Sequence, residues 1–277
     1  MTATLDASGL TARDYQTSLK PIWCPGCGDY SVLSSTTKAL AEMGVKREDI
    51  AVVTGIGCSG RFGSYTATYG FHGVHGRALA AGTGLKLGRP DLTVLVVGGD
   101  GDGFAIGGNH FLHAGRRNVD LTYIVMDNQV YGMTKGQASP TTAPDWVAKL
   151  TPHGSGVNPF QPLAVALASG ANFIARGFSG DPNNVAKLIV EAVRHPGFSF
   201  LQILSPCITY HPEQRDWKKM VRPAPYEPTE DAVKAGKQLM ADDGFNMGVL
   251  FRGNRPQYLA PEVPQKEIAD IEQAFFI

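Results

Sequence analysis

Apolar and polar positions follow two different patterns along the first 207 residues. Short apolar runs bounded by glycine or polar residues are typical of buried strands, and they occur at 50–57, 91–99, 120–128, 172–177 and 198–207. Segments with apolar residues at helical spacing or rich in small residues, which indicate helices, lie between them at 30–44, 73–88, 107–118 and 181–195. Continuous strands that alternate with helices predict a doubly wound, mostly parallel α/β sheet.

The same pattern divides the chain into three parts. Residues 1–20 are polar and predict an N-terminal arm, whereas residues 21–210 carry the strands and helices of one domain. Residues 211–277 are rich in proline and charge, with few strand signals, and predict an irregular C-terminal extension. This extension is either a mobile tail or a segment that docks on a partner subunit.

Composition narrows the class of protein. The 277 residues suit one large α/β domain with an extension. Lys plus Arg and Asp plus Glu both number 25, so no overall charge favours nucleic acid or an anionic membrane. The sequence has no apolar run long enough to span a bilayer, and its N-terminus lacks an apolar signal core. We expect a cytoplasmic protein with no nucleic-acid or membrane partner.

Four polar or sulfur-bearing residues occur at or just after the ends of predicted strands. They are Cys58, Asp100, Asn128 and Cys207. The carboxyl ends of the strands of an open parallel sheet line one edge, where ligands bind. Residues far apart in the sequence are therefore expected to meet there.

A glycine turn at one of these strand ends suggests a specific ligand. Asp100 stands between Gly99 and Gly101, and residues 102–127 separate this turn from Asn128. Carboxylate and amide oxygens suit Mg²⁺, which usually completes its coordination with phosphate oxygens and water. The helix expected after the turn begins near Gly107 and Gly108, and a helix N-terminus favours anions. A magnesium-bound diphosphate fits this pattern, although the turn alone is equally compatible with an aspartate that only caps the turn.

The cysteines are open to several interpretations when only the residues are considered. Cys24 and Cys27 form a C-x-x-C pair, and Cys58 and Cys207 are the other two of the four. Disulfides are rare in a reducing cytosol. Four thiolates suit a [4Fe–4S] cluster, a zinc ion, or no ligand at all if the cysteines are buried in the core.

Taken together, the motifs resemble those of one family. The chain is similar, over roughly residues 15–225, to the β subunit of 2-oxoacid:ferredoxin oxidoreductases, and most similar to the 2-oxoglutarate enzymes. The motifs that carry the resemblance occur in order: "WCPGCGDY", "TGIGCSGR", "HGRA", "GDGDGFAIGGNHFLHA" and "VYGMTKGQASPTT". The resemblance implies the diphosphate-binding fold of thiamine diphosphate enzymes.

The resemblance also implies roles for individual residues. Asp100 and Asn128 would bind Mg²⁺ through their side chains, and Val130 through its carbonyl oxygen. The residues expected to contact or surround thiamine diphosphate are Gly57, Cys58, Ser59, His75, Gly99, Asp100, Gly101, Asp102, Asn128, Val130, Tyr131, Gly132, Met133 and Thr134. The ligands implied for a [4Fe–4S] cluster are Cys24, Cys27, Cys58 and Cys207.

The implied reaction needs partners. In this family a 2-oxo acid is decarboxylated on thiamine diphosphate, the acyl group passes to coenzyme A, and electrons pass through the cluster to ferredoxin; the reverse carboxylation uses the same parts. A separate α subunit supplies the pyrimidine-binding domain and the activating Glu, and the usual assembly is a dimer of αβ pairs. We therefore expect this chain to be inert alone.

Two residues are candidates for catalysis or substrate recognition. His75 is expected beside the cofactor. Lys135, in "GMTKGQ", is either a solvated loop lysine or a partner for a second substrate carboxylate, and the resemblance favours the second interpretation. The alternatives are a pyruvate or broad-range 2-oxo acid substrate, or a non-redox thiamine diphosphate decarboxylase subunit with a four-cysteine zinc site.

Overall fold

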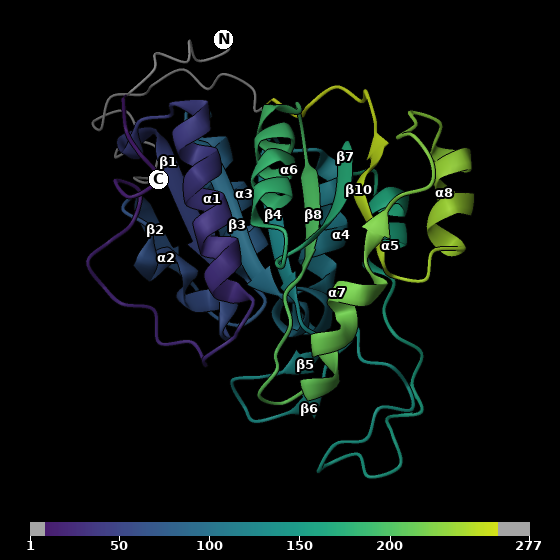
Figure 1. The fold of residues 1–277 in the computed structure, drawn as a ribbon. Helices are drawn as coiled ribbons and strands as arrows, with labels where there is room; N and C mark the ends of the chain where they lie inside the picture. The colour runs from purple at the N-terminus through teal and green to yellow at the C-terminus, as the bar shows by residue number, and fades with distance from the viewer. Residues whose placement is uncertain (1–8, 260–277) are drawn as a thin grey trace, which may run out of the picture.

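A computed structural model describes residues 9–259 of the chain, and an eight-stranded sheet forms its centre (Figure 1). The strand order is β2-β1-β3-β4-β8-β7-β10-β9. All neighbouring strands are parallel except β7 and β10, which are antiparallel. The strands are β1 (Ile50–Thr54), β2 (Tyr69–His72), β3 (Thr93–Gly99), β4 (Thr122–Asp127), β7 (Phe173–Phe178), β8 (Ser199–Leu204), β9 (Arg222–Pro223) and β10 (Asn246–Arg252).

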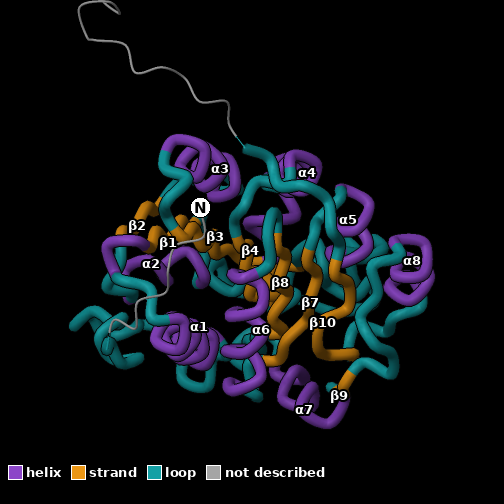
Figure 2. The backbone as a smooth tube through the Cα atoms, turned by 90° about the horizontal axis from the view of Figure 1, so that it is seen from above, coloured by secondary structure: helices purple, strands orange, loops and turns teal. Residues whose placement is uncertain are grey.

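Helices cover both faces of the sheet, as Figure 2 shows. One face packs against α1 (Asp29–Met43) and α6 (Pro182–Arg194). The other face packs against α3 (Ala78–Gly88), α4 (Gly108–Arg117), α5 (Pro162–Ser169) and α8 (Ala232–Met240). The shorter elements are α2 (Phe62–Tyr65), α7 (Trp217–Met220), the 3-10 turns Arg47–Asp49, Ser59–Arg61 and Pro212–Asp216, a π-helical segment Gly101–Ile106, and the hairpin β5 (Val130–Tyr131) and β6 (Gln137–Ala138).

The central strands are buried on both faces. All residues of β1, β4 and β8 are buried, as expected for parallel strands between two helix layers. Two hydrophobic clusters, one on each side of the sheet, hold the layers together. This rigid core fixes the strand ends from which the site is built.

The predicted doubly wound α/β fold is confirmed, and each predicted strand and helix of the core is present, with limits that differ from the predicted ones by at most five residues. Gly44 ends α1 in a left-handed conformation, with φ 66°. Asp181 caps α6, because its side chain accepts a hydrogen bond from the Asn184 N–H. None of the helices described within residues 9–259 has the length and apolar character needed to cross a bilayer.

The interpretation of residues 211–277 as a segment almost without strands is wrong in one respect. Residues 246–252 form β10, which pairs with β7 and extends the sheet of the main domain. The strand is irregular: Gly248 has φ 119°, and the pairing shifts register between Val249 and Phe251. Such an irregularity breaks the alternation of inward and outward side chains, so the sequence does not show the pattern of a regular strand here. Part of the predicted arm (1–8) and of the predicted extension (260–277) lies outside the described residues.

Candidate active site

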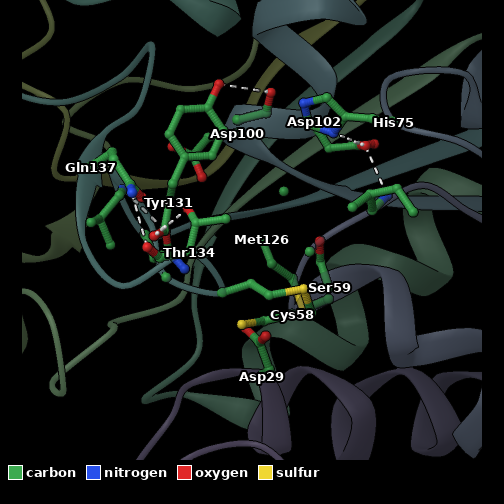
Figure 3. Close-up of a pocket in the computed structure, with 18 residues that line it drawn as sticks. Asp29, Cys58, Ser59, His75, Asp100, Asp102, Met126, Tyr131, Thr134 and Gln137 are labelled. Carbon is green, nitrogen blue, oxygen red and sulfur yellow. Dashed lines mark hydrogen bonds and ion pairs between the residues drawn. The ribbon is translucent and has the colours of Figure 1, made fainter.

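A cavity of about 500 Å³ opens at the carboxyl ends of β1, β3 and β4 (Figure 3). Every residue predicted to surround the cofactor lines this cavity: Gly57, Cys58, Ser59, His75, Gly99, Asp100, Gly101, Asp102, Asn128, Val130, Tyr131, Gly132, Met133 and Thr134. The sheet topology brings these segments together, because the strands that precede them are neighbours in the order β1-β3-β4. Open parallel sheets bind ligands at this edge.

Asp100 follows β3 and is almost completely buried, with 2% of its surface exposed. One of its carboxylate oxygens accepts hydrogen bonds from the hydroxyls of Ser139 and Thr141. The Thr141 hydroxyl also lies 2.8 Å from a carboxylate oxygen of Asp127. Burial, followed by the proximity of Asp127, raises the pKa of Asp100 to about 8. In the described part of the chain no basic side chain forms an ion pair with Asp100.

Asn128 follows β4, and a tight turn holds it beside the cavity. The side-chain oxygen of Asn128 accepts a hydrogen bond from the Val130 N–H at 3.1 Å. Gln129, between them, has φ 53°, a left-handed conformation that is uncommon outside glycine and occurs most often in turns. Because of this turn both Asn128 and Val130 line the cavity, so the three predicted magnesium ligands lie in one site.

The glycines of the site permit close approaches that a side chain would prevent. A Cβ atom on Gly101 would lie 2.2 Å from the ring of Tyr131, which packs across the glycine turn. A Cβ atom on Gly132 would lie 3.4 Å from the sulfur of Cys207 and 3.9 Å from that of Cys58. The loop after β4 therefore passes directly beside two of the cysteines.

Asp102 lies on the other side of the same turn, and it is contacted by backbone N–H groups and a histidine instead of hydroxyl groups. One of its oxygens accepts hydrogen bonds from the N–H groups of Ile56 and Gly76, each at 2.8 Å. The same oxygen lies 3.0 Å from Nδ1 of His75. When Nδ1 donates to this oxygen, Nε2 faces no hydrogen-bond partner among residues 9–259. The His75 side chain is 40% exposed and lines the cavity.

The four cysteines gather next to the cavity, and all are free. Cys24 is exposed, Cys27 and Cys58 are half-buried, and Cys207 is buried. Burial raises the pKa of Cys58 to about 12, with smaller contributions from Asp29, Cys207 and Cys24. The pKa of Cys27 is raised for the same main reason, with contributions from Asp29, Cys207 and Cys58. Cys58 therefore lies near each of the other three thiols, and it is the one cysteine of the four that lines the cavity.

Within residues 9–259, no three or more His, Cys, Asp or Glu side chains form a group that could hold a single metal ion. The predicted magnesium site would not form such a group, because two of its three ligands are the amide oxygen of Asn128 and the carbonyl oxygen of Val130. The thiolates of a cubane would not form one either, because they bind different iron atoms and stand further apart than the ligands of one ion.

Of the residues predicted for catalysis or for thiamine diphosphate binding, Lys135 alone does not line the cavity. It lies in the turn between β5 and β6 with φ 78°, it is exposed, and it is absent from the residues that line the cavity. Its neighbour Thr134 does line the cavity.

Sequence reasoning missed several residues of the site. Asp29, Ile56, Met126 and Gln137 also line the cavity. Asp29 begins α1, two residues after Cys27; it is 1% exposed and accepts a hydrogen bond from the Ser205 hydroxyl. Its position beside the C-x-x-C pair was the available signal. Ser139 and Thr141 lie within the quoted "GQASPTT" segment, but only the folded chain places them on Asp100.

Comparison with known proteins agrees with this geometry. The family model described as the C-terminal TPP binding domain of thiamine pyrophosphate enzymes matches residues 55–203. The 2-oxoglutarate oxidoreductase subunit KorB of Mycobacterium tuberculosis is 47% identical over 195 residues, which cover 70% of this chain and 52% of that protein. The 2-oxoacid:ferredoxin oxidoreductase subunit beta of Sulfolobus sp is 38% identical over 280 residues, covering 90% of this chain and 91% of that protein. The chain thus spans about half the length of the first relative and most of the second.

A solved structure extends the likeness to the whole fold. The 2-oxoglutarate:ferredoxin oxidoreductase from Magnetococcus marinus, with 2-oxoglutarate, coenzyme A and succinyl-CoA bound, matches with a TM-score of 0.87 and 38% identity. The match covers 96% of this chain and 91% of that one. The resemblance inferred from the motifs is confirmed: the chain belongs to the family of 2-oxoacid:ferredoxin oxidoreductase beta subunits, and residues 55–203 form its thiamine pyrophosphate enzyme domain.

Proposed function

We propose that this chain binds thiamine diphosphate with Mg²⁺ in the cavity and serves a 2-oxoglutarate:ferredoxin oxidoreductase. The observation that carries the proposal is the convergence of Asp100, Asn128 and Val130 with the sulfurs of Cys58 and Cys207 around one loop. A cofactor site and a cluster site in contact are what an oxidative decarboxylase needs, because electrons must leave the substrate one at a time.

The residues present fit a magnesium-bound diphosphate. Asp100, Asn128 and the Val130 carbonyl supply hard oxygen ligands of the kind Mg²⁺ prefers. Asp100 and Asp127 are buried carboxylates bridged by one hydroxyl, and a divalent cation would offset their charge. When bound, thiamine diphosphate supplies a carbon nucleophile for the 2-oxo acid and an electron sink after carbon dioxide leaves.

His75 would act on the substrate side of the cavity. Its hydrogen bond to Asp102 sets the tautomer and the ring orientation, and leaves Nε2 available for a hydrogen bond to substrate or cofactor. One oxygen of Asp102 takes all three contacts, from Ile56, Gly76 and His75. It therefore positions His75.

We assign the four cysteines to a [4Fe–4S] cluster because none of them is in a disulfide and the sulfurs of Cys58 and Cys207 both lie within 4 Å of the Cβ position of Gly132 beside the cavity. Burial raises the pKa of Cys58 to about 12, so a bound metal centre would have to offset this burial to hold Cys58 as a thiolate. Cys24, Cys27, Cys58 and Cys207 would each bind one iron. The cluster would accept electrons singly and pass them to ferredoxin.

The described part of the site does not supply the glutamate that the resemblance implies for cofactor activation, and this supports a partner subunit that supplies it. Among the residues described, the cavity lining contains aspartates but no glutamate, so the activating Glu must come from elsewhere. Apolar side chains are exposed at Met133, which lines the cavity, at Val74, next to His75 in the chain, and at Ile106, which lies beside Gly76. We assign this surface to an α subunit that supplies the pyrimidine-binding domain, in a dimer of αβ pairs.

For the substrate we propose 2-oxoglutarate, with coenzyme A as acyl acceptor, because the M. tuberculosis relative is named for 2-oxoglutarate and the M. marinus structure holds both molecules. Lys135 would meet the second carboxylate from the β5–β6 turn. A cytoplasmic location remains a prediction from composition.

The first experiment is metal analysis of the complex purified without oxygen. About four iron and four acid-labile sulfide per copy of this chain, after subtraction of clusters on partners, would support the proposal. Reduction of ferredoxin that depends on 2-oxoglutarate and coenzyme A would then support the substrate. Zinc without sulfide would reject the electron path in favour of a non-redox decarboxylase, and faster turnover of pyruvate would reject the substrate.

A further inference from the structure

One buried glutamine joins the two halves of the site. Gln214, in the 3-10 turn Pro212–Asp216, is only 1% exposed. Its side-chain oxygen accepts a hydrogen bond from the Cys207 N–H at 2.8 Å. Its side-chain nitrogen donates to the Asn128 carbonyl oxygen at 2.6 Å. A single side chain thus contacts the backbone of a proposed magnesium ligand and of a proposed cluster ligand.

The orientation of this amide is not arbitrary. A backbone N–H can only donate and a carbonyl oxygen can only accept, so Oε1 must face Cys207 and Nε2 must face Asn128. A glutamate could keep the first hydrogen bond but, when ionised, would place an oxygen against the Asn128 carbonyl. A methionine of similar length could make neither. The position therefore requires both ends of an amide.

The turn that carries Gln214 is itself held in place. The His211 N–H donates to the Cys207 carbonyl at 2.8 Å, and the Gln214 N–H donates to the His211 carbonyl at 3.1 Å. The His211 ring is 8% exposed and stacks on Trp146, with centroids 4.6 Å apart. Gln214 is thus held on a turn that backbone hydrogen bonds and the stacked His211 ring keep in place.

We propose that Gln214 is a positioning residue that couples the diphosphate site to the cluster site. It would hold the loop after β4 and the loop after β8 at a fixed separation, where Gly132 approaches the sulfurs of Cys207 and Cys58. Gln214 would also hold the Cys207 N–H away from other acceptors, including cluster sulfur, and hydrogen bonds to sulfur are one determinant of cluster potential. This inference rests on the proposed function.

The test uses the intact αβ complex with Gln214→Met, Gln214→Glu and a control, Gln238→Met. Gln238 lies on α8, away from the cavity, and its side-chain oxygen has no hydrogen-bond partner. Two properties are measured in each: the Kd of Mg-thiamine diphosphate from fluorescence quenching, and the reduction potential and EPR signal of the cluster. Hydrogen-bond partners behind metal ligands typically change metal affinity or activity about 10- to 100-fold.

We expect Gln214→Met to raise the Kd about tenfold and also to shift the potential and EPR signal of the cluster, while Gln238→Met changes neither. Gln214→Glu, measured at pH 8, should raise the Kd while retaining the iron content of the wild type, because only the hydrogen bond to Asn128 is lost. This variant keeps the test open if Gln214→Met fails to fold.

Other results overturn the coupling. If Gln214→Met changes only one of the two properties, or matches Gln238→Met in both, Gln214 does not couple the sites. Absence of iron and sulfide from the wild-type complex is a separate result, which would reject the proposed function itself.

Discussion

Two aspartates on one glycine turn face opposite sides of the site and serve it in different ways. Asp100 is contacted by hydroxyl groups and lies beside a second buried carboxylate, Asp127. Asp102 is bound by two backbone N–H groups and by His75. Both are almost fully buried, so burial alone does not distinguish them.

The two aspartates differ in whether their hydrogen-bond donors have other acceptors within reach. Backbone N–H groups have no other acceptor when buried, so Asp102 is part of the scaffold that joins the segments after β1 and before α3. The hydroxyls on Asp100 have alternatives, since Thr141 also contacts Asp127 and Ser139 also contacts Thr142. A substitution of Asp100 should therefore mainly weaken ligand binding, whereas a substitution of Asp102 should mainly lower the stability of the fold.

The largest effect on function is expected for Asp100→Ala. Removing a direct metal ligand should weaken Mg-thiamine diphosphate binding by more than about 100-fold, which is the upper range for residues behind the ligands, and should abolish turnover. Cofactor titration and an assay of 2-oxoglutarate-dependent ferredoxin reduction measure both. Retained turnover would mean that chemistry occurs elsewhere and that this cavity is only a scaffold.

The largest effect on stability is expected for Asp102→Ala. Leaving the buried N–H of Gly76 and the half-buried N–H of Ile56 without their carboxylate acceptor should lower the free energy of unfolding by about 3 kcal/mol. Asp100→Ala should lower it by only about 1 kcal/mol, because its hydroxyl partners can turn to other acceptors. Urea unfolding of the cofactor-free chain compares the two, and equal losses would contradict the distinction drawn above.

A smaller effect is expected for Thr141→Val, which removes the hydroxyl between Asp100 and Asp127 without changing the shape of the side chain. The affinity for Mg-thiamine diphosphate should fall about tenfold. Thr151→Val is the matched control, because the Thr151 hydroxyl is buried and has no hydrogen-bond partner. Similar affinities for the two variants would show that the hydroxyl on Asp100 does not affect the metal site.

The smallest and most selective effect is expected for Lys135→Ala. Loss of a charged contact should raise the KM for 2-oxoglutarate about tenfold and leave that for pyruvate unchanged. Lys187→Ala, an exposed lysine on α6, is the control. Because Lys135 lies outside the cavity lining, an equal rise for both substrates, or none, would remove it from the site.

The core strands were predictable because β1, β3, β4, β7 and β8 are apolar along most of their length, a pattern that burial on both faces imposes. The missed elements lack such a pattern. The edge strand β2 has only four residues, and all four are exposed. Because no residue of β2 has to be buried, its sequence does not carry the long apolar run of a central strand. Helix α5 is short and apolar on most of its surface, which hides its period.

The amino-acid sequence by itself determined the class of fold, the glycine turns, and which oxygen and sulfur atoms are available as ligands, because these depend on residue type and local spacing. The tertiary structure decided which of them meet. Only the strand order brings the segments after β1, β3 and β4 to one cavity. The hydrogen bonds that Gln214 makes to Asn128 and Cys207 span 86 and 7 residues. No local pattern records such contacts, because they depend on the three-dimensional packing of the whole sheet.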